Sequence, residues 1–343
     1  MIMGKGKIFQ ALDKTFIQEL FKRKKKLFFP SVKGKISEIK IKRVSPDWAK
    51  ESCLVRYEIL FDNDTKKIVR GTAKAKKSEK SVWQIMKYLY YQDFNSGNLQ
   101  IAKPLDYIAD INLLLYEESP GVTLTEIIEK ETKTIIEKNL KNTARWLVKL
   151  HSLDFIKKGF PKATFIGFDG YKNIFHKIKK YIPELRGNLT PLNKIKFINQ
   201  IWKNEKNFIH NDFYPGNSIS NKKIIFGIDL DRAGIGPFLM DIAAFYGALE
   251  FPKEFWDLKI SIKQIRHFQD IFLREYCKLR KLNYLQIKKD LKKFLVKIFL
   301  DQIYNYAAGT IKYRNLMDKK TKDSYVLKIK TLLLKIKQYL KNL

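Results

Sequence analysis

The first third of the chain carries apolar residues in short runs of the kind that form strands. Residues 39–44 and 54–61 are rich in β-branched and aromatic side chains, and the turn-forming residues 62–64 lead from the second run into a third, residues 67–75. Residues 78–90 then carry Val, Ile, Met and Leu at helical spacing. The pattern predicts an antiparallel sheet followed by a helix.

The rest of the chain is predicted to be mainly helical. Residues 113–117 form one more apolar run, which stops at the break Pro120-Gly121. Helical spacing of apolar residues follows this break and recurs in three later segments, residues 142–154, 285–306 and 325–340. A chain of 343 residues exceeds one ordinary core, so we expect an α+β protein with two lobes.

The segment 208–244 holds the strongest chemical signal in the sequence. Asp212 is followed five residues later by Asn217, and the apolar, β-branched run 224–228 then leads to Asp229. This order, D-x-x-x-x-N and then D after a strand, is that of protein-kinase-type active sites. A lone D-x-x-x-x-N is more often a turn, because Asp and Asn side chains bond nearby backbone groups. The combination with the strand favours a site.

These residue types suit phosphoryl transfer from a nucleotide, which requires an aligned nucleophile and charge neutralisation by Mg²⁺. Asp212 can accept or orient the proton of an attacking hydroxyl group. The amide oxygen of Asn217 and the carboxylate of Asp229 are ligands that a hard cation prefers. We therefore predict ATP and Mg²⁺ as cofactors, Asp212 as the catalytic base, and Asn217 and Asp229 as the metal ligands; GTP in place of ATP stays open.

The sequence HNDFYPGN…GIDLDRAGIGPFLMDIA resembles the aminoglycoside phosphotransferase and choline kinase superfamily, which is related to the protein kinases. The resemblance implies a two-lobed protein-kinase-like fold, with a small antiparallel-sheet N-lobe and a larger, mainly helical C-lobe. It implies the same roles for Asp212, Asn217 and Asp229, and makes Asp241 a structural acid that ties down the catalytic loop. Asn211 stands where the family usually has Gly, and Asn tolerates left-handed backbone angles better than most residues.

The phosphate-binding lysine of this family is expected in the N-lobe. Lys74, in the sequence RGTAKA, resembles it. A Glu of the next helix pairs with this lysine in the family, but Val82 or Gln84 stands at the aligned positions here. Glu79, at the start of the predicted helix, is the only acid in residues 78–90, and whether it pairs with Lys74 stays open.

The other nucleotide contacts are expected from the N-lobe backbone. Residues 45–52 would form the nucleotide loop but contain no Gly, so backbone N–H groups or Ser52 would bind the phosphates. The strand 113–117 resembles the hinge of the family, and exposed backbone at Glu117 and Glu118 is expected to face the adenine ring.

His151 and Asp231 are ambiguous in the sequence. His151 lies in NTARWLVKLHSLD, residues 142–154, which resembles a helix of the family, and we interpret it as a packing residue rather than a catalyst. Asp231 comes two residues after Asp229. It is a further metal ligand, an acid that supports the metal ligands without binding the metal, or a surface charge. These alternatives stay open.

We divide the chain into a basic N-terminal helical extension (1–35), a nucleotide-binding N-lobe (36–118) and a catalytic, acceptor-binding helical C-lobe (119–343). The segment from Trp256 onward is rich in Lys and poor in acids. A cationic acceptor would require clustered carboxylates, so this composition favours a neutral or anionic acceptor such as a sugar or a glycan.

The chain is strongly basic, with 68 Lys and Arg against 35 Asp and Glu and a formal net charge of +33. Such a surface attracts polyanions, and the candidate patches are residues 22–26, 74–77 and 288–293. Lys greatly outnumbers Arg, and no cluster of arginines with interleaved aromatics is present. We therefore prefer compositional bias as the explanation and do not expect a nucleic-acid partner.

Segment 21–30, FKRKKKLFFP, joins basic residues to an apolar run. It either anchors the protein at an anionic membrane or ends a helix whose aromatics pack on the N-lobe, and we favour the second interpretation. The sequence shows neither a membrane-spanning apolar stretch nor a signal peptide, and two cysteines give no disulfide framework. We expect a cytoplasmic protein, with peripheral contact at the inner membrane face left open.

Two functions remain. The first is an ATP- and Mg²⁺-dependent kinase that phosphorylates a hydroxyl group of a sugar, glycan or related metabolite. The second is a non-catalytic kinase-like protein whose basic surface binds a polyanion, either nucleic acid or an anionic membrane; the missing glycines and the open Lys–Glu pair motivate it. Retention of Asp212, Asn217 and Asp229 favours the first. The oligomeric state is not predicted.

Overall fold

The computed structural model describes residues 6–46, 50–75, 79–154, 160–189, 192–201, 207–250, 260–313, 315 and 317–341. The chain forms two compact units, which we call the N-lobe (Met1–Gly121 with Ile219–Asp231) and the C-lobe (Val122–Ser218 with Arg232–Leu343). The predicted α+β class, with an antiparallel sheet in the N-lobe and a mainly helical C-lobe, is confirmed. The domain boundaries at 35/36 and 118/119 stay a proposal. Lys76, Lys77 and Ser78, together with residues 47–49 of the predicted nucleotide loop, lie outside the described residues.

The N-lobe is built on a five-stranded antiparallel sheet of order β1-β2-β3-β6-β5. Its strands are β1 (Ile36–Arg43), β2 (Ser52–Phe61), β3 (Lys66–Lys74), β5 (Pro104–Ile108) and β6 (Leu113–Glu117). Every second residue of β2 is buried, because successive side chains of a strand point to opposite faces. The strands predicted at 39–44, 54–61, 67–75 and 113–117 are all present, within a few residues at their ends.

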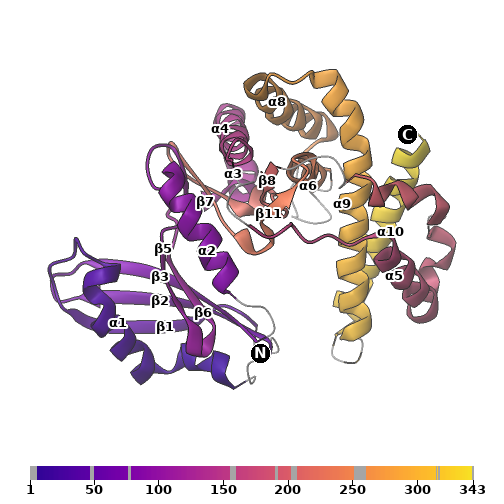
Figure 1. Cartoon of the computed structure of the whole chain (residues 1–343). Helices are drawn as coiled ribbons and strands as arrows, with labels where there is room; N and C mark the ends of the chain where they lie inside the picture. Colours follow the sequence, from indigo (N-terminus) through magenta and orange to yellow (C-terminus); the bar gives the residue numbers. More distant parts are fainter. Residues whose placement is uncertain are drawn as a thin grey trace. The chain divides into compact units, whose positions relative to one another are not determined.

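One face of this sheet is covered by helix α1 (Lys14–Phe28) and the preceding 3₁₀ helix Lys7–Leu12 (Figure 1). Phe21, Phe28 and Phe29 are buried there, and the ring of Phe21 lies 5.5 Å from that of Tyr57 in β2. The hydroxyl group of Tyr57 donates to the carbonyl group of Ala11 at 2.7 Å. The aromatics of segment 21–30 therefore belong to the N-lobe core, as the packing interpretation predicts.

Helix α2 (Lys80–Leu89) follows β3 and buries its apolar side, as the helical spacing predicts. A π-helical turn (Tyr90–Phe94) leads to a small sheet of β4 (Leu99–Ile101), β10 (Ile224–Gly227) and β9 (Ser218–Asn221). Gly121 passes close to this sheet with φ of 119°, and a Cβ at this position would lie 2.2 Å from the carbonyl oxygen of Ser220. The predicted break at Pro120-Gly121 thus requires Gly for steric reasons.

The C-lobe is mainly helical (Figure 1). Its helices are α3 (Leu124–Lys130), α4 (Lys133–His151), α5 (Phe168–Tyr181), α6 (Leu239–Leu249), α8 (Ile262–Arg280), α9 (Tyr284–Lys312) and α10 (Lys319–Lys341). Its strands are β7 (Val122–Thr123), β8 (Asn207–Ile209) and β11 (Gly234–Gly236), and β8 pairs with β11 in antiparallel orientation. Short 3₁₀ helices lie in both lobes, at Ala109–Ile111, Pro183–Asn188, Leu192–Asn199, Pro215–Asn217 and Leu230–Arg232.

Helix α6 is the centre of the C-lobe. Ten of its eleven residues are buried, as expected for a helix that is apolar on all sides. Long helices pack around it: α9 lies against both α6 and α10, and α4 lies against α8. The helices predicted at 142–154, 285–306 and 325–340 correspond to parts of α4, α9 and α10.

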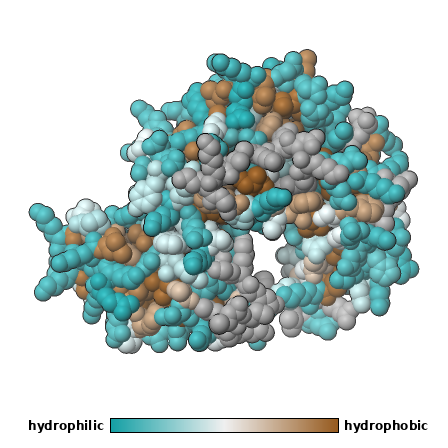
Figure 2. All heavy atoms as spheres, in the orientation of Figure 1, coloured by the Kyte–Doolittle hydropathy of each residue, from teal (hydrophilic) through white to brown (hydrophobic). Residues whose placement is uncertain are grey.

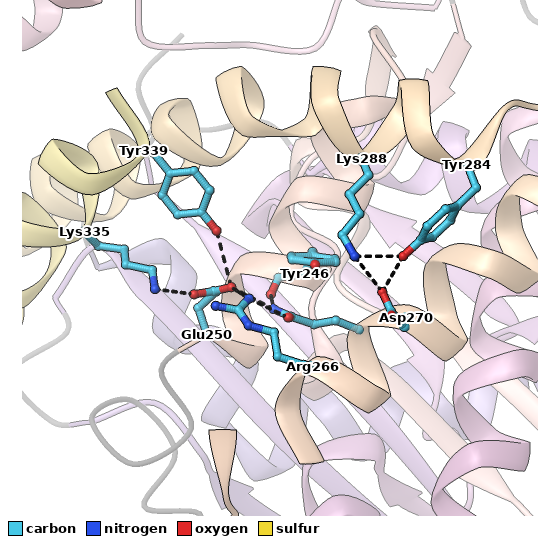
Figure 3. A network of polar contacts seen from close by, with 9 residues as sticks. Tyr246, Glu250, Arg266, Asp270, Tyr284, Lys288, Lys335 and Tyr339 are labelled. Carbon is cyan, nitrogen blue, oxygen red and sulfur yellow. Dashed lines mark hydrogen bonds and ion pairs between the residues drawn. The ribbon is translucent and has the colours of Figure 1, made fainter. Parts of the chain in front are cut away.

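A polar network joins α6, α8, α9 and α10 (Figure 3). Glu250, which follows α6, is almost completely buried; its carboxylate contacts Arg266 of α8 and lies 2.7 Å from the ammonium group of Lys335 in α10. Next to it, Lys288 of α9 lies 3.0 Å from the carboxylate of Asp270. At least one lysine of the basic run 288–293 therefore forms an ion pair within the C-lobe.

The surface seen in Figure 2 is dominated by hydrophilic residues. Over the described part of the chain, no helix is long and apolar enough to cross a membrane.

Candidate active site

The loop of residues 210–217 follows β8 and is fixed to α6 by Asp241. One carboxylate oxygen of Asp241 accepts the backbone N–H of His210 at 2.7 Å, and the other accepts that of Asn211 at 2.6 Å. Asp241 is fully buried, so these bonds are shielded from water and hold the loop tightly. This geometry suits the structural role that the family resemblance implies for Asp241.

His151 holds Asp241 from the other side. Its Nε2 lies 3.0 Å from the Asp241 carboxylate, and its Nδ1 lies 2.8 Å from the hydroxyl group of Tyr276. Burial lowers the pKa of His151, although the Asp241 carboxylate opposes this. A neutral imidazole then donates from Nε2 to Asp241 and accepts from Tyr276 at Nδ1. The buried position predicted for His151 is confirmed, and the residue also orients Asp241.

Asn211 has a left-handed backbone conformation, which Gly adopts without strain and Asn tolerates better than most residues. Its φ is 59°, and its side-chain amide donates to the carbonyl group of Thr164 at 2.9 Å. This bond compensates for part of the cost of a left-handed angle at a non-Gly residue.

Asn217 is oriented by the backbone of Asp212. The side chain is buried, and its amide nitrogen donates to the Asp212 carbonyl group at 2.9 Å. The amide oxygen therefore points away from this bond and remains suited to a hard cation. The 3₁₀ helix Pro215–Asn217 sets this orientation.

Asp229, the second predicted metal ligand, belongs to the N-lobe and follows β10. It is exposed and has a φ of 61°, which is unusual for a residue other than Gly. Such strain often marks a functional position. No group of three or more His, Cys, Asp or Glu side chains is placed to hold a metal among the residues described.

Lys74 is paired with two carboxylates of the N-lobe. Its ammonium nitrogen lies 3.3 Å from a carboxylate oxygen of the fully buried Glu79, and it also contacts the carboxylate of Asp231. The pair with Glu79, which the sequence left open, is thus formed, whereas Val82 is buried in the core. Asp231 acts here as a partner of Lys74.

Asn112 holds the backbone on both sides of this ion pair. Its side-chain oxygen accepts the N–H of Glu79 at 2.9 Å and the hydroxyl group of Tyr107 at 3.0 Å, while its nitrogen donates to the carbonyl group of Lys74. Asn112 itself has a left-handed φ of 50°. No local pattern in the sequence pointed to Asn112, because the tertiary fold brings it to Lys74.

The other predicted nucleotide residues also lie in the N-lobe. Ser52 pairs directly with Lys74 across β2 and β3. The N–H of Glu117 donates to the carbonyl group of Lys103 at 2.9 Å, and that of Glu118 to Ile68 at 3.0 Å. Both N–H groups already donate hydrogen bonds within the lobe. A contact between this segment and adenine would therefore depend on the carbonyl groups of Glu117 and Glu118.

A cavity of about 240 Å³ opens beside Asp212 in the C-lobe. It lies between the 210–217 loop, α6 and α9, and its lining residues are Asn211, Asp212, Tyr214, Arg232, Met240, Ala244, Ala248, Ile298, Asp301, Gln302, Asn305 and Tyr306. The sequence predicted a C-terminal acceptor pocket but none of its α9 residues. Their spacing was a usable signal, since positions 298, 301, 302 and 305 share one face of a helix.

The fold and this site define a phosphotransferase of the kinase type, with an alcohol group as acceptor. Residues 67–282 match the model of the phosphotransferase enzyme family, so the chain belongs to this family. Comparison with curated proteins finds no match.

Solved structures of kinases share the fold. A choline kinase from Cryptosporidium parvum Iowa II has a TM-score of 0.61 at 15% identity, over 96% of each chain. A thermostable mutant of aminoglycoside phosphotransferase APH(4)-Ia, in ternary complex with AMP-PNP and hygromycin B, has a TM-score of 0.59 at 16% identity, over 93% of this chain and 98% of that one. An amicoumacin kinase in complex with AMP-PNP and Ca²⁺ has a TM-score of 0.57 at 15% identity, over 94% and 96%.

Proposed function

We propose that the protein is an ATP- and Mg²⁺-dependent kinase that phosphorylates a hydroxyl group of a sugar, a glycan or a related metabolite. The observation that carries this proposal is the cavity beside Asp212, because it offers space for an acceptor at the predicted base. Asp212 is the catalytic base of the proposal, Asn217 and Asp229 bind the metal, and Lys74 and Ser52 contact the phosphates.

The proposed reaction follows from these positions. The acceptor hydroxyl oxygen forms a bond to the γ-phosphorus atom while the bond to the β,γ-bridging oxygen breaks, and the hydroxyl proton passes to Asp212. Asn217 and Asp229 would hold Mg²⁺, which neutralises charge on the phosphate oxygens when it is bound. The bonds from Asp241 to His210 and Asn211 keep the loop in place, so that Asp212 needs little reorganisation.

The solved relatives support the cofactors of the proposal. The aminoglycoside phosphotransferase was solved with AMP-PNP, and the amicoumacin kinase with AMP-PNP and Ca²⁺. We infer that a nucleoside triphosphate and a divalent cation bind here as well, and we propose ATP and Mg²⁺. The ion pair between Lys74 and Glu79 also removes one of the reasons for a non-catalytic alternative.

A thermal-shift titration tests the proposal. ATP with Mg²⁺ is expected to raise the melting temperature of the wild type, because a ligand that binds only the folded state stabilises it. Asp229→Ala should lose the Mg²⁺-dependent part of this rise, whereas Asp110→Ala, which alters another exposed N-lobe acid, should retain it. Absence of any shift in the wild type would refute the proposal.

A further inference from the structure

The cavity beside Asp212 contains a carboxylate that is already neutralised. Both oxygens of Asp301 in α9 contact the ammonium group of Lys297, at 2.7 and 2.6 Å, and one of them also accepts the hydroxyl group of Tyr171. Lys297 is fully buried and does not line the cavity. Because one ammonium group faces one carboxylate, this pair carries no net charge.

The other charged groups of the cavity also balance. Asp212 contributes a negative charge and Arg232 a positive one, so the four groups Asp212, Arg232, Asp301 and Lys297 sum to zero. A cationic acceptor would find Asp301 occupied by Lys297 and would also face Arg232, and an anionic acceptor would face Asp212, so an acceptor of either sign meets no net opposite charge in the cavity. Moving either charged acceptor from water into the cavity costs desolvation free energy, and the cavity offers little favourable charge interaction to offset this cost.

Uncharged hydrogen-bonding groups complete the lining. Gln302 and Asn305 of α9 face the cavity, with Tyr214 and Tyr306 nearby. The side-chain oxygen of Gln302 is buried, and no donor among the described residues contacts it. A buried acceptor without a donor is costly. A rotation of the Gln302 amide group that turns this oxygen toward the cavity would let it accept a hydrogen bond from a hydroxyl group of a ligand.

On the basis of the proposed function, we propose that the acceptor is an uncharged polyhydroxylated molecule about the size of one sugar ring. Gln302 accepts a hydrogen bond from one of its hydroxyl groups, and Lys297 sets the preference by neutralising Asp301. The cavity volume of about 240 Å³ leaves room for several water molecules, and this space suits a monosaccharide or the terminal ring of a glycan.

Acceptors matched in shape and different in charge test this proposal. ADP release would be measured with glucose, glucosamine and glucuronate, and with the corresponding galactose series. We expect the neutral member of at least one series to have a kcat/KM that is at least about tenfold above those of its charged partners, since an unmatched buried polar group gives discrimination of this order or more.

Two variants assign the preference to the named residues. Lys297→Met leaves Asp301 without its cation and should shift the preference toward glucosamine, whereas Lys293→Met, at an exposed residue one turn earlier in α9, should not. Gln302→Leu should raise the KM for the neutral acceptor about tenfold or more, without lowering the melting temperature, because it removes an unsatisfied buried oxygen. A purely structural Gln302 would instead lower the melting temperature and leave this KM unchanged.

The inference and the proposed function fail in different ways. Stabilisation by ATP with Mg²⁺ in the absence of any acceptor tests nucleotide binding alone. If this stabilisation is present and the cationic or anionic member of each series is preferred, or no neutral member is phosphorylated, the inference is wrong and nucleotide binding stands. If Lys297→Met does not fold, the ranking in the wild type and the result for Gln302→Leu still decide the matter.

Discussion

Lys74 and Glu79 form an ion pair with a nitrogen-to-oxygen distance of 3.3 Å, although Glu79 precedes the first residue of α2. A partner within the helix would be expected one turn later, where this chain has Val82. Asn112 allows Glu79 to pair with Lys74 from this earlier position. Its side chain hydrogen-bonds both the carbonyl group of Lys74 and the N–H of Glu79 and so holds the two residues together.

We expect Glu79→Gln to weaken ATP binding. Lys74 would lose its ion pair with a fully buried carboxylate and keep only the one with Asp231. The ammonium group that is proposed to contact the phosphates would then be held less precisely. The KM for ATP should rise about tenfold, as is usual for the loss of one charge-assisted contact. Steady-state kinetics would show this, and Glu38→Gln, a change of an exposed acid on β1, should leave the KM unchanged. An unaltered KM in Glu79→Gln would mean that the pair has no part in nucleotide binding.

Asp241→Asn should destabilise the C-lobe and reduce turnover together. The amide cannot accept the N–H groups of both His210 and Asn211, so at least one buried donor loses a charged partner. The loss is about 3 kcal/mol in the free energy of unfolding. Urea denaturation measures it, with Asp323→Asn on the exposed side of α10 as the control. Equal stability of the two variants would contradict the role of Asp241.

The sequence indicated those parts of the proposed site that are local in the chain. Asp212, Asn217 and Asp229 lie within one segment, and their order indicates phosphoryl transfer, whereas the role expected for Asp241 came from the family resemblance. Residues that meet only through the tertiary fold were missed, as Asn112 shows: it reaches Lys74 from a turn 38 residues away.

The acceptor pocket shows the same limit. The pattern of residues 285–306 predicted a helix, but it did not single out Asp301 or Gln302. Their spacing places them on one face of α9, but only the packing of α9 with α6 and the 210–217 loop makes this face line a cavity. The short strands β4, β8, β9 and β11 were not predicted either, because runs of three or four residues carry too little periodicity.

Asp212→Ala should abolish phosphoryl transfer and leave nucleotide binding nearly intact. Removal of a general base lowers the rate by about 10² to 10⁴-fold. The Asp212 carbonyl group, which holds Asn217, is kept in the variant, so the loop should retain its shape. ADP release measures turnover, and the thermal shift with ATP and Mg²⁺ measures binding. Turnover close to that of the wild type would remove Asp212 from the role of base.

The carboxylate of Glu250 predicts a pH dependence of stability. Burial alone would raise the pKa of Glu250, but the hydrogen bond from Lys335 and the charge of Arg266 outweigh this and lower it (Figure 3). The folded state thus binds a proton less readily than the unfolded state. The contribution of Glu250 to stability is complete above the ordinary pKa of 4.5 and is lost as the pH falls from there through the lowered pKa of the folded state.

Glu250→Gln isolates this contribution. At pH 7 the variant should be less stable than the wild type by about 2 kcal/mol, because the cations of Arg266 and Lys335 lose a carboxylate that joins α8 to α10. Below pH 4.5 the difference should shrink, since the wild type itself becomes protonated. Urea denaturation at both pH values gives the two differences, and Glu129→Gln, an exposed change in α3, should show neither effect. A difference that stays constant with pH would show that the cost comes from packing and not from the charge of Glu250.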